Sequence, residues 1–562
     1  METETAGRQT RYRFVHELLR QTLSESLSLP RRQRLHARVA QVMERVYAAS
    51  IDAHVSALAH HLYQAGSSVD QEKTIHFLSE AARQASGAAA HEEALEHLDN
   101  AVSLLDDERT ARDADLRVQR AAALRSLSRN QEAVQEYERA LNVFDSLGDH
   151  VRFVETCAPL AILLMRAGQL QDVSAVVDRA ARHAKDSPAS VRCRLLAMQA
   201  NSAGSAGEID RGLELLEELH KISENELPLG VIGFAAEQEM YTRYEAGQLD
   251  LCEAAARKAT RIFEQSGDVW SVADVAIGVF WPPLHCGQPA EAERLIRETI
   301  RRAAQVGHDV AKSCALAALP VVYLAKGHVE SAERAAREAL AFGESSHFGW
   351  LFLIETGLGG VLLYRARTEE GLSLLTRAAC GPTTHFSGFP EGLLALGMTA
   401  AEREGAVNAC TAAMRFLPRP GASRGSGAWH AVLGLTEALC LSARREEAGR
   451  LQTEAEKIAA EWDCNYVGFP VRTAAGIAAA CAGNWTRAEE HLQAAIRQAD
   501  TAPHRVAQPA ARYWYADMLL TRDAPGDSAR ARNLLGEALA MFGSLGMPVY
   551  SRRAAERQQP IS

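Results

Sequence analysis

The sequence predicts an all-α protein, a right-handed superhelical solenoid of about twelve helix-turn-helix repeats of roughly 40 residues each. The first observation is composition: 47% of the 562 residues are hydrophobic and only 18 are proline, which favours helix throughout. The second is a set of turn residues at a fixed spacing, and the third is an apolar pattern of helical period beside each turn. Because single cores stop growing near about 250 to 300 residues, an evenly composed chain of this length indicates a repeat array.

The spacing of small turn residues sets the period. Between the first five of them, successive steps are 39 or 40 residues, and the later steps are 78, 38 and 40. The step of 78 spans two repeats. The turn residues are Gly168, Gly207, Gly247, Gly287, Gly327, Gly405, Ala443 and Gly483.

Each repeat is expected to be a helix, a tight turn and a second helix. At Gly327, an apolar run over residues 321–325 precedes the turn. Alanines follow it at the spacing of one buried helical face, and their small side chains allow neighbouring helices to pack closely. These alanines are Ala332, Ala335, Ala336 and Ala339.

A second marker ends the second helix of a repeat. A glycine stands four residues after a phenylalanine at Gly148, Gly267 and Gly546, with a weaker copy at Gly307. Glycine in this place is typical of a helix C-terminus. A unit of this size cannot bury its own apolar face, so the repeats are expected to stack and to form a concave groove.

The register divides the chain into three parts. We expect an N-terminal helical linker over residues 1–70, the solenoid over residues 71–550 and a C-terminal tail over residues 551–562. No segment has the pattern of a β-strand.

Charge and composition exclude several classes of function. With 61 Lys and Arg against 71 Asp and Glu, the net charge is -10, so binding of nucleic acid by this chain alone is not expected. No window approaches about 18 uninterrupted apolar residues, which argues against a membrane span. The ten cysteines lack any Cys-x-x-Cys pair, as expected for reduced, buried thiols in a cytoplasmic protein.

Four aromatic residues are candidates for contacts in the groove. Trp270 and Trp350 are 80 residues apart, which is two periods, and Phe280 and Trp281 precede two prolines that should end or kink a first helix before the turn. Two interpretations are open. The aromatic side chains fill the gap left by the kink, or they line a pocket for a peptide or a small effector.

A connector over residues 381–390 is rich in Gly, Pro and Thr and contains His385 and Phe386. Long connectors in solenoids gather on the face where binding occurs. We therefore expect this segment to lie over the groove as a lid, with both residues as possible ligand contacts.

The repeats resemble those of the tetratricopeptide family, in the long-helix variant of maltose-activator-like regulators and bacterial signalling ATPases. The resemblance rests on residues 323–327 with Ala332, Ala336 and Ala339, and on Ala133, Tyr137 and Ala140 in an earlier repeat. The usual period is shorter, and the consensus Trp and Pro are mostly missing. The resemblance implies a non-enzymatic scaffold for protein interaction and effector sensing.

Segments of the first seventy residues resemble the part that joins an NTPase module to helical repeats in multidomain signal-transduction ATPases, including adenylate-cyclase-type and LuxR-type regulators. These segments are residues 12–20, 30–36, 58–61 and 65–66. Yet the chain contains no Gly-Lys dipeptide and so lacks the phosphate loop of such ATPases. The alternative function is therefore the regulatory half, split or truncated, of an ATP-dependent transcription regulator or nucleotidyl cyclase that acts on catalysis in trans.

Four arginines near the N-terminus are candidates for partner docking. In a helix that begins at Pro30, rotation by about 100° per residue places them on one stripe, beside a second stripe of Leu35, Val39, Val42 and Val46. The charge is either a solvated face or a docking surface for an acidic partner such as a P-loop NTPase. The arginines are Arg31, Arg34, Arg38 and Arg45.

No catalytic residue, cofactor or metal site is predicted. His54 and His61 are two helical turns apart, about 10 Å along the axis, which is too far to share one metal ion. His91 and His97 are six residues apart instead of the four of a zinc-protease helix.

Overall fold

The computed structural model describes residues 2–6, 9–13, 27–105, 109–184, 187–381, 386–418, 426–461, 465–466, 469–502 and 504–559. Helices dominate these residues, as the sequence predicts. The chain forms two compact units, Met1–Asp149 and His150–Ser562.

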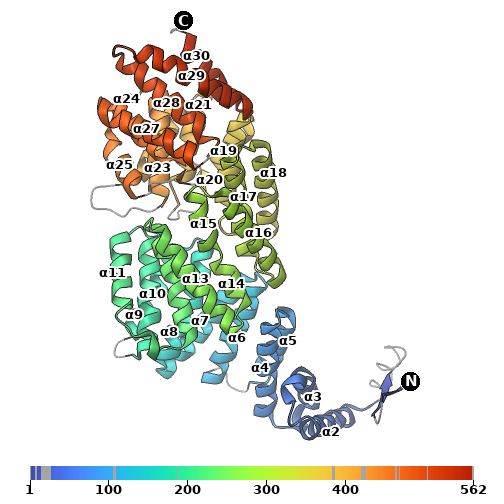
Figure 1. Ribbon diagram of the computed structural model, residues 1–562. Coiled ribbons are helices and arrows are strands. Elements are labelled where there is room, and N and C mark those ends of the chain that lie inside the picture. Colours follow the sequence, from blue (N-terminus) through green and yellow to red (C-terminus); the bar gives the residue numbers. More distant parts are fainter. Residues whose placement is uncertain are drawn as a thin grey trace. The chain divides into compact units, whose positions relative to one another are not determined.

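The first unit begins with a short antiparallel strand pair, followed by helices (Figure 1). Its last four helices form two hairpins, α4 with α5 and α6 with α7. The elements are β1 (Glu2–Ala6), β2 (Gln9–Arg13), α2 (Leu29–Val46), η1 (Ile51–His54), α3 (Val55–Ala65), η2 (Gly66–Ser68), α4 (Gln71–Gly87), α5 (His91–Val102), α6 (Ala111–Ser126) and α7 (Asn130–Leu147).

The second unit continues the pattern with ten further hairpins and a last helix, in chain order (Figure 1). Its first five hairpins are α8 (His150–Arg166) with α9 (Leu170–His183), α10 (Ala189–Ser205) with α11 (Ile209–Leu219), α12 (Leu229–Glu245) with α13 (Leu249–Ser266), α14 (Val269–Val275) and α15 (Ile277–His285) with α16 (Pro289–Val306), and α17 (Asp309–Ala325) with α18 (Val329–Ser345). The next five are α19 (Leu351–Tyr364) with α20 (Thr368–Ala379), α21 (Phe389–Ala400) with α22 (Ala406–Ala413), α23 (Ser426–Leu441) with α24 (Arg445–Arg450) and α25 (Gln452–Glu461), α26 (Val471–Cys481) with α27 (Trp485–Thr501), and α28 (Ala507–Arg522) with α29 (Asp527–Ser544). The unit also contains α30 (Pro548–Gln558), η3 (Glu224–Glu226), η4 (Met414–Phe416), β3 (Asn465–Tyr466) and β4 (Phe469–Pro470).

The turn inside each hairpin contains a residue of positive φ, and these residues recur every 36 to 41 positions. At Gly168, the backbone amide of Gln169 donates to the carbonyl of Leu164 over 2.9 Å, a bond that closes the helix end only when the chain turns left-handed. Half of the twelve positions are not glycine, which is why glycine spacing alone reveals only part of the array. The positions are Ala89, Ser128, Gly168, Gly207, Gly247, Gly287, Gly327, Ala366, Glu402, Ala443, Gly483 and Asp523.

First helices of successive hairpins pack on one another in the second unit, as α8, α10 and α12 do, and as α15, α17 and α19 do. The second helices pack against them. In α18 the predicted contact positions Ala332, Ala336 and Ala339 are all buried. The predicted register of about forty residues is therefore confirmed, and it yields twelve hairpins in the part of the chain that the structure describes.

Two local predictions differ from the structure. The pairs β1–β2 and β3–β4 are short antiparallel strands, although no strand was expected. The predicted helix break near Pro282 and Pro283 exists, but it lies earlier, at Ala276 between α14 and α15, and both prolines stand inside α15. The division at residues 70 and 550 stays a prediction.

Candidate functional site

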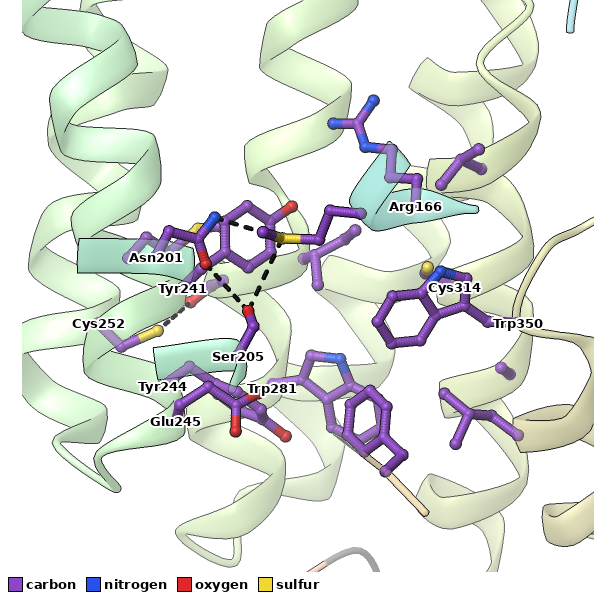
Figure 2. A pocket seen from close by; sticks show the side chains of 18 of the residues that line it. Arg166, Asn201, Ser205, Tyr241, Tyr244, Glu245, Cys252, Trp281, Cys314 and Trp350 are labelled. Atoms are coloured by element: carbon purple, nitrogen blue, oxygen red, sulfur yellow. Dashed lines mark hydrogen bonds between the residues drawn. The ribbon is translucent and has the colours of Figure 1, made fainter. Parts of the chain in front are cut away.

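The first helices of six successive hairpins in the second unit line a partly open cavity of about 240 Å³. Its wall is mostly apolar and aromatic, as Figure 2 shows for the side chains from α8, α10, α12, α15, α17 and α19. The lining positions shift along the repeat, from the C-terminal turn of α8 to the N-terminal half of α19, so the cavity crosses the stacked first helices.

The cavity is closed where the chain returns to α8. A Cβ on Gly349 would lie only 2.7 Å from the carbonyl oxygen of Arg166, so the turn before α19 packs against the end of α8 without a side chain. On another side, Tyr244 packs against the core cluster of Trp429 and Val432 at α23. These contacts narrow the groove on two sides.

Three of the predicted aromatic contacts line this cavity, namely Trp281, Trp350 and Phe386. The rings of Trp350 and Phe386 meet edge to face, with centroids 5.2 Å apart. Trp281 stacks on His285, whose Nε2 lies 3.2 Å from the hydroxyl of Tyr244. The aromatic side chains are thus held in fixed orientations by one another and by a hydrogen bond.

Local backbone chemistry brings α15 close to α12 and α13. Gly278 leaves no room for a side chain, since a Cβ there would overlap Met240. Pro282 has no amide hydrogen to give to the carbonyl four residues earlier, which is that of Gly278. The thiol of Cys252 donates to this carbonyl over 3.8 Å instead. The two-proline segment is therefore accommodated inside a helix and presents Trp281 to the cavity.

The other two predicted aromatic contacts lie elsewhere. Phe280 is fully buried in the core with Leu284, Ile296 and Leu316, because the residue after it on the helix takes the inward position. Trp270 stacks on His308, with centroids 3.8 Å apart and planes 13° apart. Both side chains stabilise the wall from behind, so the packing interpretation holds for them.

Trp270 belongs to a buried ion-pair network behind the cavity wall. Arg166 pairs with Asp274 and lies 3.9 Å from Glu237, and its guanidinium stands over the Trp270 ring. Asp274 is also 3.2 Å from Nε2 of His308. The positive charge of Arg166, which lines the cavity, is therefore neutralised by two carboxylates.

Polar side chains of α10 and α12 form the main hydrogen-bonding group of the wall. Asn201 Nδ2 donates to Gln238 Oε1 over 2.7 Å and lies 3.5 Å from the sulfur of Met165. The hydroxyl of Ser205 donates to Asn201 Oδ1 over 3.3 Å. Figure 2 shows Asn201 and Ser205 of this cluster with their hydrogen bonds, which include the hydroxyl of Ser205 to the sulfur of Met165 over 3.7 Å.

Two cysteines of the wall have thiols of low reactivity. Burial raises the pKa of Cys252 and of Cys314 to about 12 in each case. Because the thiolate is the nucleophilic form of cysteine, both side chains behave as small apolar residues, as expected. The expectation of buried thiols does not hold for Cys286 and Cys380, which are exposed.

Sequence reasoning missed most of the cavity wall. Arg166, Asn201 and Gln238 come from helix positions that give no aromatic or spacing signal, and they meet Trp350 only through the curvature of the stack. The predicted contact His385 lies outside the described residues.

The predicted arginines are on α2 in the first unit, and each of Arg31, Arg34, Arg38 and Arg45 is exposed. No carboxylate of the described residues forms an ion pair with them, and Arg34 Nε donates to the carbonyl of Pro30. The aliphatic residues beside them are exposed too, because the small Ala37 and Ala40 face the core instead. They are Leu35, Val39, Val42 and Val46. We call these eight residues the α2 outer face.

Two other kinds of site are absent from the described part of the chain. Its His, Cys, Asp and Glu side chains include no group of three or more that could hold a metal ion. None of its helices is long and apolar enough to span a bilayer.

Comparisons with known proteins support the fold. No family model matches the chain, and no curated protein matches it. A chain of the APC/C hetero-tetramer Cut9–Hcn1 superposes with a TM-score of 0.51 at 13% identity, over 92% of this chain and 93% of that one. A Rap protein complexed with competence and sporulation factor has a TM-score of 0.40 at 12% identity, over 73% of this chain and 97% of that one. Yeast Tom70 has a TM-score of 0.26 at 14% identity, over 87% and 97%. The chain has a helical-repeat fold of the tetratricopeptide type.

Proposed function

We propose that this chain is a non-enzymatic scaffold in bacterial signalling that senses a small effector or the apolar anchor of a peptide in the cavity of its second unit and passes that state to a protein partner in the cytoplasm. The partly open, aromatic cavity along the first helices carries this proposal. Ligand sites are typically concave and apolar with a few fixed polar groups, and this cavity has that composition.

Rigid aromatic side chains favour binding without a large ordering cost. Trp281 and Trp350 are already oriented by neighbouring rings, so a ligand gains apolar contact while few side chains lose freedom. Because six successive helices share the wall, a ligand that contacts all of them would stabilise one curvature of the repeat stack. Such a differential contact is what an effector needs in order to shift a conformational equilibrium.

The α2 outer face supports a second role, as the docking surface of a partner. Its exposed arginines and aliphatic side chains fit an acidic protein surface with an apolar centre. We infer that a P-loop NTPase or a regulator with such a surface binds there, so that this chain acts as the regulatory half of an ATP-dependent regulator or nucleotidyl cyclase. No ATP binding by this chain alone is expected.

Binding of Nile red, a neutral apolar fluorophore, tests the cavity. Ala317 lines the cavity on α17, and Ala317→Trp should fill it and weaken binding at least tenfold. Ala341→Trp places the same side chain at an exposed position of α18 and should leave binding unchanged.

The expected wild-type result is saturable binding at one site per chain with enhanced dye emission. Absence of saturable binding, or equal binding by Ala317→Trp and the wild type, would contradict the proposed function. Circular dichroism of both variants shows whether the fold is intact.

A further inference from the structure

Two cysteine thiols from successive hairpins of the second unit lie next to one another. Cys440 is in the last turn of α23, and Cys481 ends α26, the first helix of the next hairpin. The two residues are about one repeat apart in the chain, and α23 and α26 pack on one another. The thiol of Cys440 donates a hydrogen bond to the sulfur of Cys481. Both are free thiols.

The two thiols differ in their access to solvent. Cys440 is only 7% exposed and belongs to a core cluster with Ile477 and Leu519. Cys481 is half-buried and packs against the edge of the same cluster. A small reagent from solvent therefore meets Cys481 first.

Helix α24 holds a cation beside the pair. A Cβ on Gly449 would lie 3.0 Å from the carbonyl carbon of Cys481, so α24 packs directly on the end of α26. The first residue of α24, Arg445, is near both thiols, and its Nη2 donates to Asp517 Oδ2 over 2.8 Å. Asp517 also pairs with Arg557. The carboxylate is shared between two guanidinium groups, so the charge of Arg445 is only partly compensated.

These neighbours make one thiol reactive and keep the other protonated. The hydrogen bond from Cys440 lowers the pKa of Cys481, and Arg445 lowers it further, against the opposing effects of burial and of Asp517. The same hydrogen bond, together with burial, raises the pKa of Cys440. Because the thiolate is the form that attacks an oxidant, Cys481 is the nucleophile and Cys440 is the thiol that resolves the oxidised product.

We propose that Cys440 and Cys481 are a redox-sensitive thiol pair that a peroxide converts to a disulfide, which links two successive first helices of the repeat stack. Neither cysteine lines the cavity, so the pair is independent of the proposed function. The disulfide fixes the angle between α23 and α26.

The reaction needs only the two thiols and hydrogen peroxide. The Cys481 thiolate attacks one peroxide oxygen, the O–O bond breaks and hydroxide leaves, so that Cys481 becomes a sulfenic acid. The sulfur of Cys440 then attacks the sulfur of Cys481, the S–O bond breaks, and the leaving hydroxide takes the Cys440 proton as water. The two sulfurs together lose two electrons, which the peroxide gains, and both peroxide oxygens end as water.

Cys286 provides a matched single thiol for a test of reactivity. It stands directly before the turn residue Gly287 and is exposed, whereas burial and the carboxylates of Asp250 and Glu253 raise its pKa. Exposure alone predicts that Cys286 is alkylated faster. At pH 7, iodoacetamide should instead alkylate Cys481 of the reduced full chain about tenfold faster than Cys286, as measured by mass spectrometry of the peptides.

Treatment of the full chain with hydrogen peroxide tests the disulfide. The wild type should yield two peptides joined through Cys440 and Cys481, lighter by two hydrogens and separated by a thiol reductant. Cys440→Ala should abolish this product and leave Cys481 as a sulfenic acid, which dimedone labels. The matched control is Cys410→Ala, which removes a buried thiol from a cluster that Cys481 also contacts and should leave the disulfide yield unchanged.

The role of Arg445 has its own readout in the pH profile of Cys481 alkylation. Arg445→Gln should move the midpoint of this profile to higher pH, because the thiolate loses its nearby cation. Arg445→Lys keeps the positive charge and should restore the midpoint.

Two results in the wild type would overturn the proposal without relying on any variant. One is alkylation of Cys481 no faster than that of Cys286. The other is peroxide treatment that leaves both thiols reduced, or that converts Cys481 to a sulfinic acid without forming the disulfide. Binding of Nile red in the cavity is unaffected by either result, so the proposed function is tested separately.

Discussion

The cavity of the second unit and the α2 outer face of the first both combine apolar and charged side chains. They differ in whether the charges are paired and in how far the apolar side chains are exposed. In the cavity, Arg166 is paired with carboxylates, and the apolar side chains of six helices face one another across a partly open pocket. On α2, the arginines form no ion pair with any carboxylate of the described residues, and the aliphatic side chains remain exposed, from 40% at Val39 to 64% at Val46. Such a pocket suits a small ligand, whereas an exposed basic and apolar face suits a protein surface.

The largest expected effect on stability comes from removing a buried carboxylate that pairs with Arg166. Asp274→Ala leaves Arg166 and His308 without their shared carboxylate, and breaking such a buried pair costs about 3 to 5 kcal/mol. Hydrogen exchange should therefore become faster in α8, α14 and α17. The control is Glu330→Ala, which removes an exposed partner of Arg334 and should change stability by less than about 0.5 kcal/mol.

Exchange that stays slow in all three helices of Asp274→Ala would show that the network contributes little to the wall. The measurement is local by design, because a long repeat array does not unfold as a single two-state unit.

The next effect tests how the cavity is closed. Gly349→Ala would place a methyl group against the backbone of Arg166 and Ala167, and the resulting shift should cost about 1 to 3 kcal/mol and weaken Nile red binding. Gly543→Ala is the matched control, since a Cβ there meets nothing within 4 Å and the residue lies in the last turn of α29, away from the cavity. It should leave Nile red binding unchanged and should not destabilise the helix. Equal behaviour of the two variants would mean that the turn before α19 does not close the cavity.

A smaller effect is expected on the pH dependence of stability, to which a buried carboxyl group contributes more than an exposed one. Burial raises the pKa of Glu437 to about 7, despite the nearby charge of Arg553 and a hydrogen bond from Trp514. The folded state therefore holds this proton more tightly than the unfolded state, where a glutamate has a pKa near 4.3. Stability should fall as pH rises from about 5 to above 7, by roughly 1 to 2 kcal/mol.

Glu437→Gln should remove this part of the pH dependence, as measured by hydrogen exchange of α23 and α28 at several pH values. An unchanged slope between pH 5 and 8 in the variant would assign the dependence to other groups.

The smallest effect on stability is expected on the α2 outer face. Changing Arg31, Arg34 and Arg38 together to Ala should alter the free energy of unfolding by less than about 0.5 kcal/mol, since exposed charges contribute little. Binding of a poly-L-glutamate probe should slow mainly in the association rate, and added salt should have the same effect on the wild type. Unchanged association kinetics at low salt would assign the arginines to a solvated face.

The sequence predicts the repeat well because a local pattern determines it. Alanines at helical spacing and left-handed turn residues act within one hairpin, so Ala336 and Gly327 reveal their roles without knowledge of the neighbours. Trp281, Trp350 and Phe386 were predictable as candidates for the same reason, since aromatic residues near a kink or a long connector stand out.

The rest of the site depends on how small rotations between successive hairpins add up. The contact between Arg166 and Asp274 joins residues 108 positions apart, and Gly349 meets α8 only because the stack curves. Gln238 resembles any polar residue of a helix until that curvature buries it. On α2, periodicity shows which residues share a face, but it does not show whether a neighbour covers that face.

Hydrogen exchange of the purified chain with and without saturating Nile red tests the central claim most directly. The account predicts slower exchange in the inner helices α8, α10, α12, α15, α17 and α19, with no change in α2. Protection of α2 alone, or protection nowhere in residues 150–562, would contradict a ligand site inside the second unit.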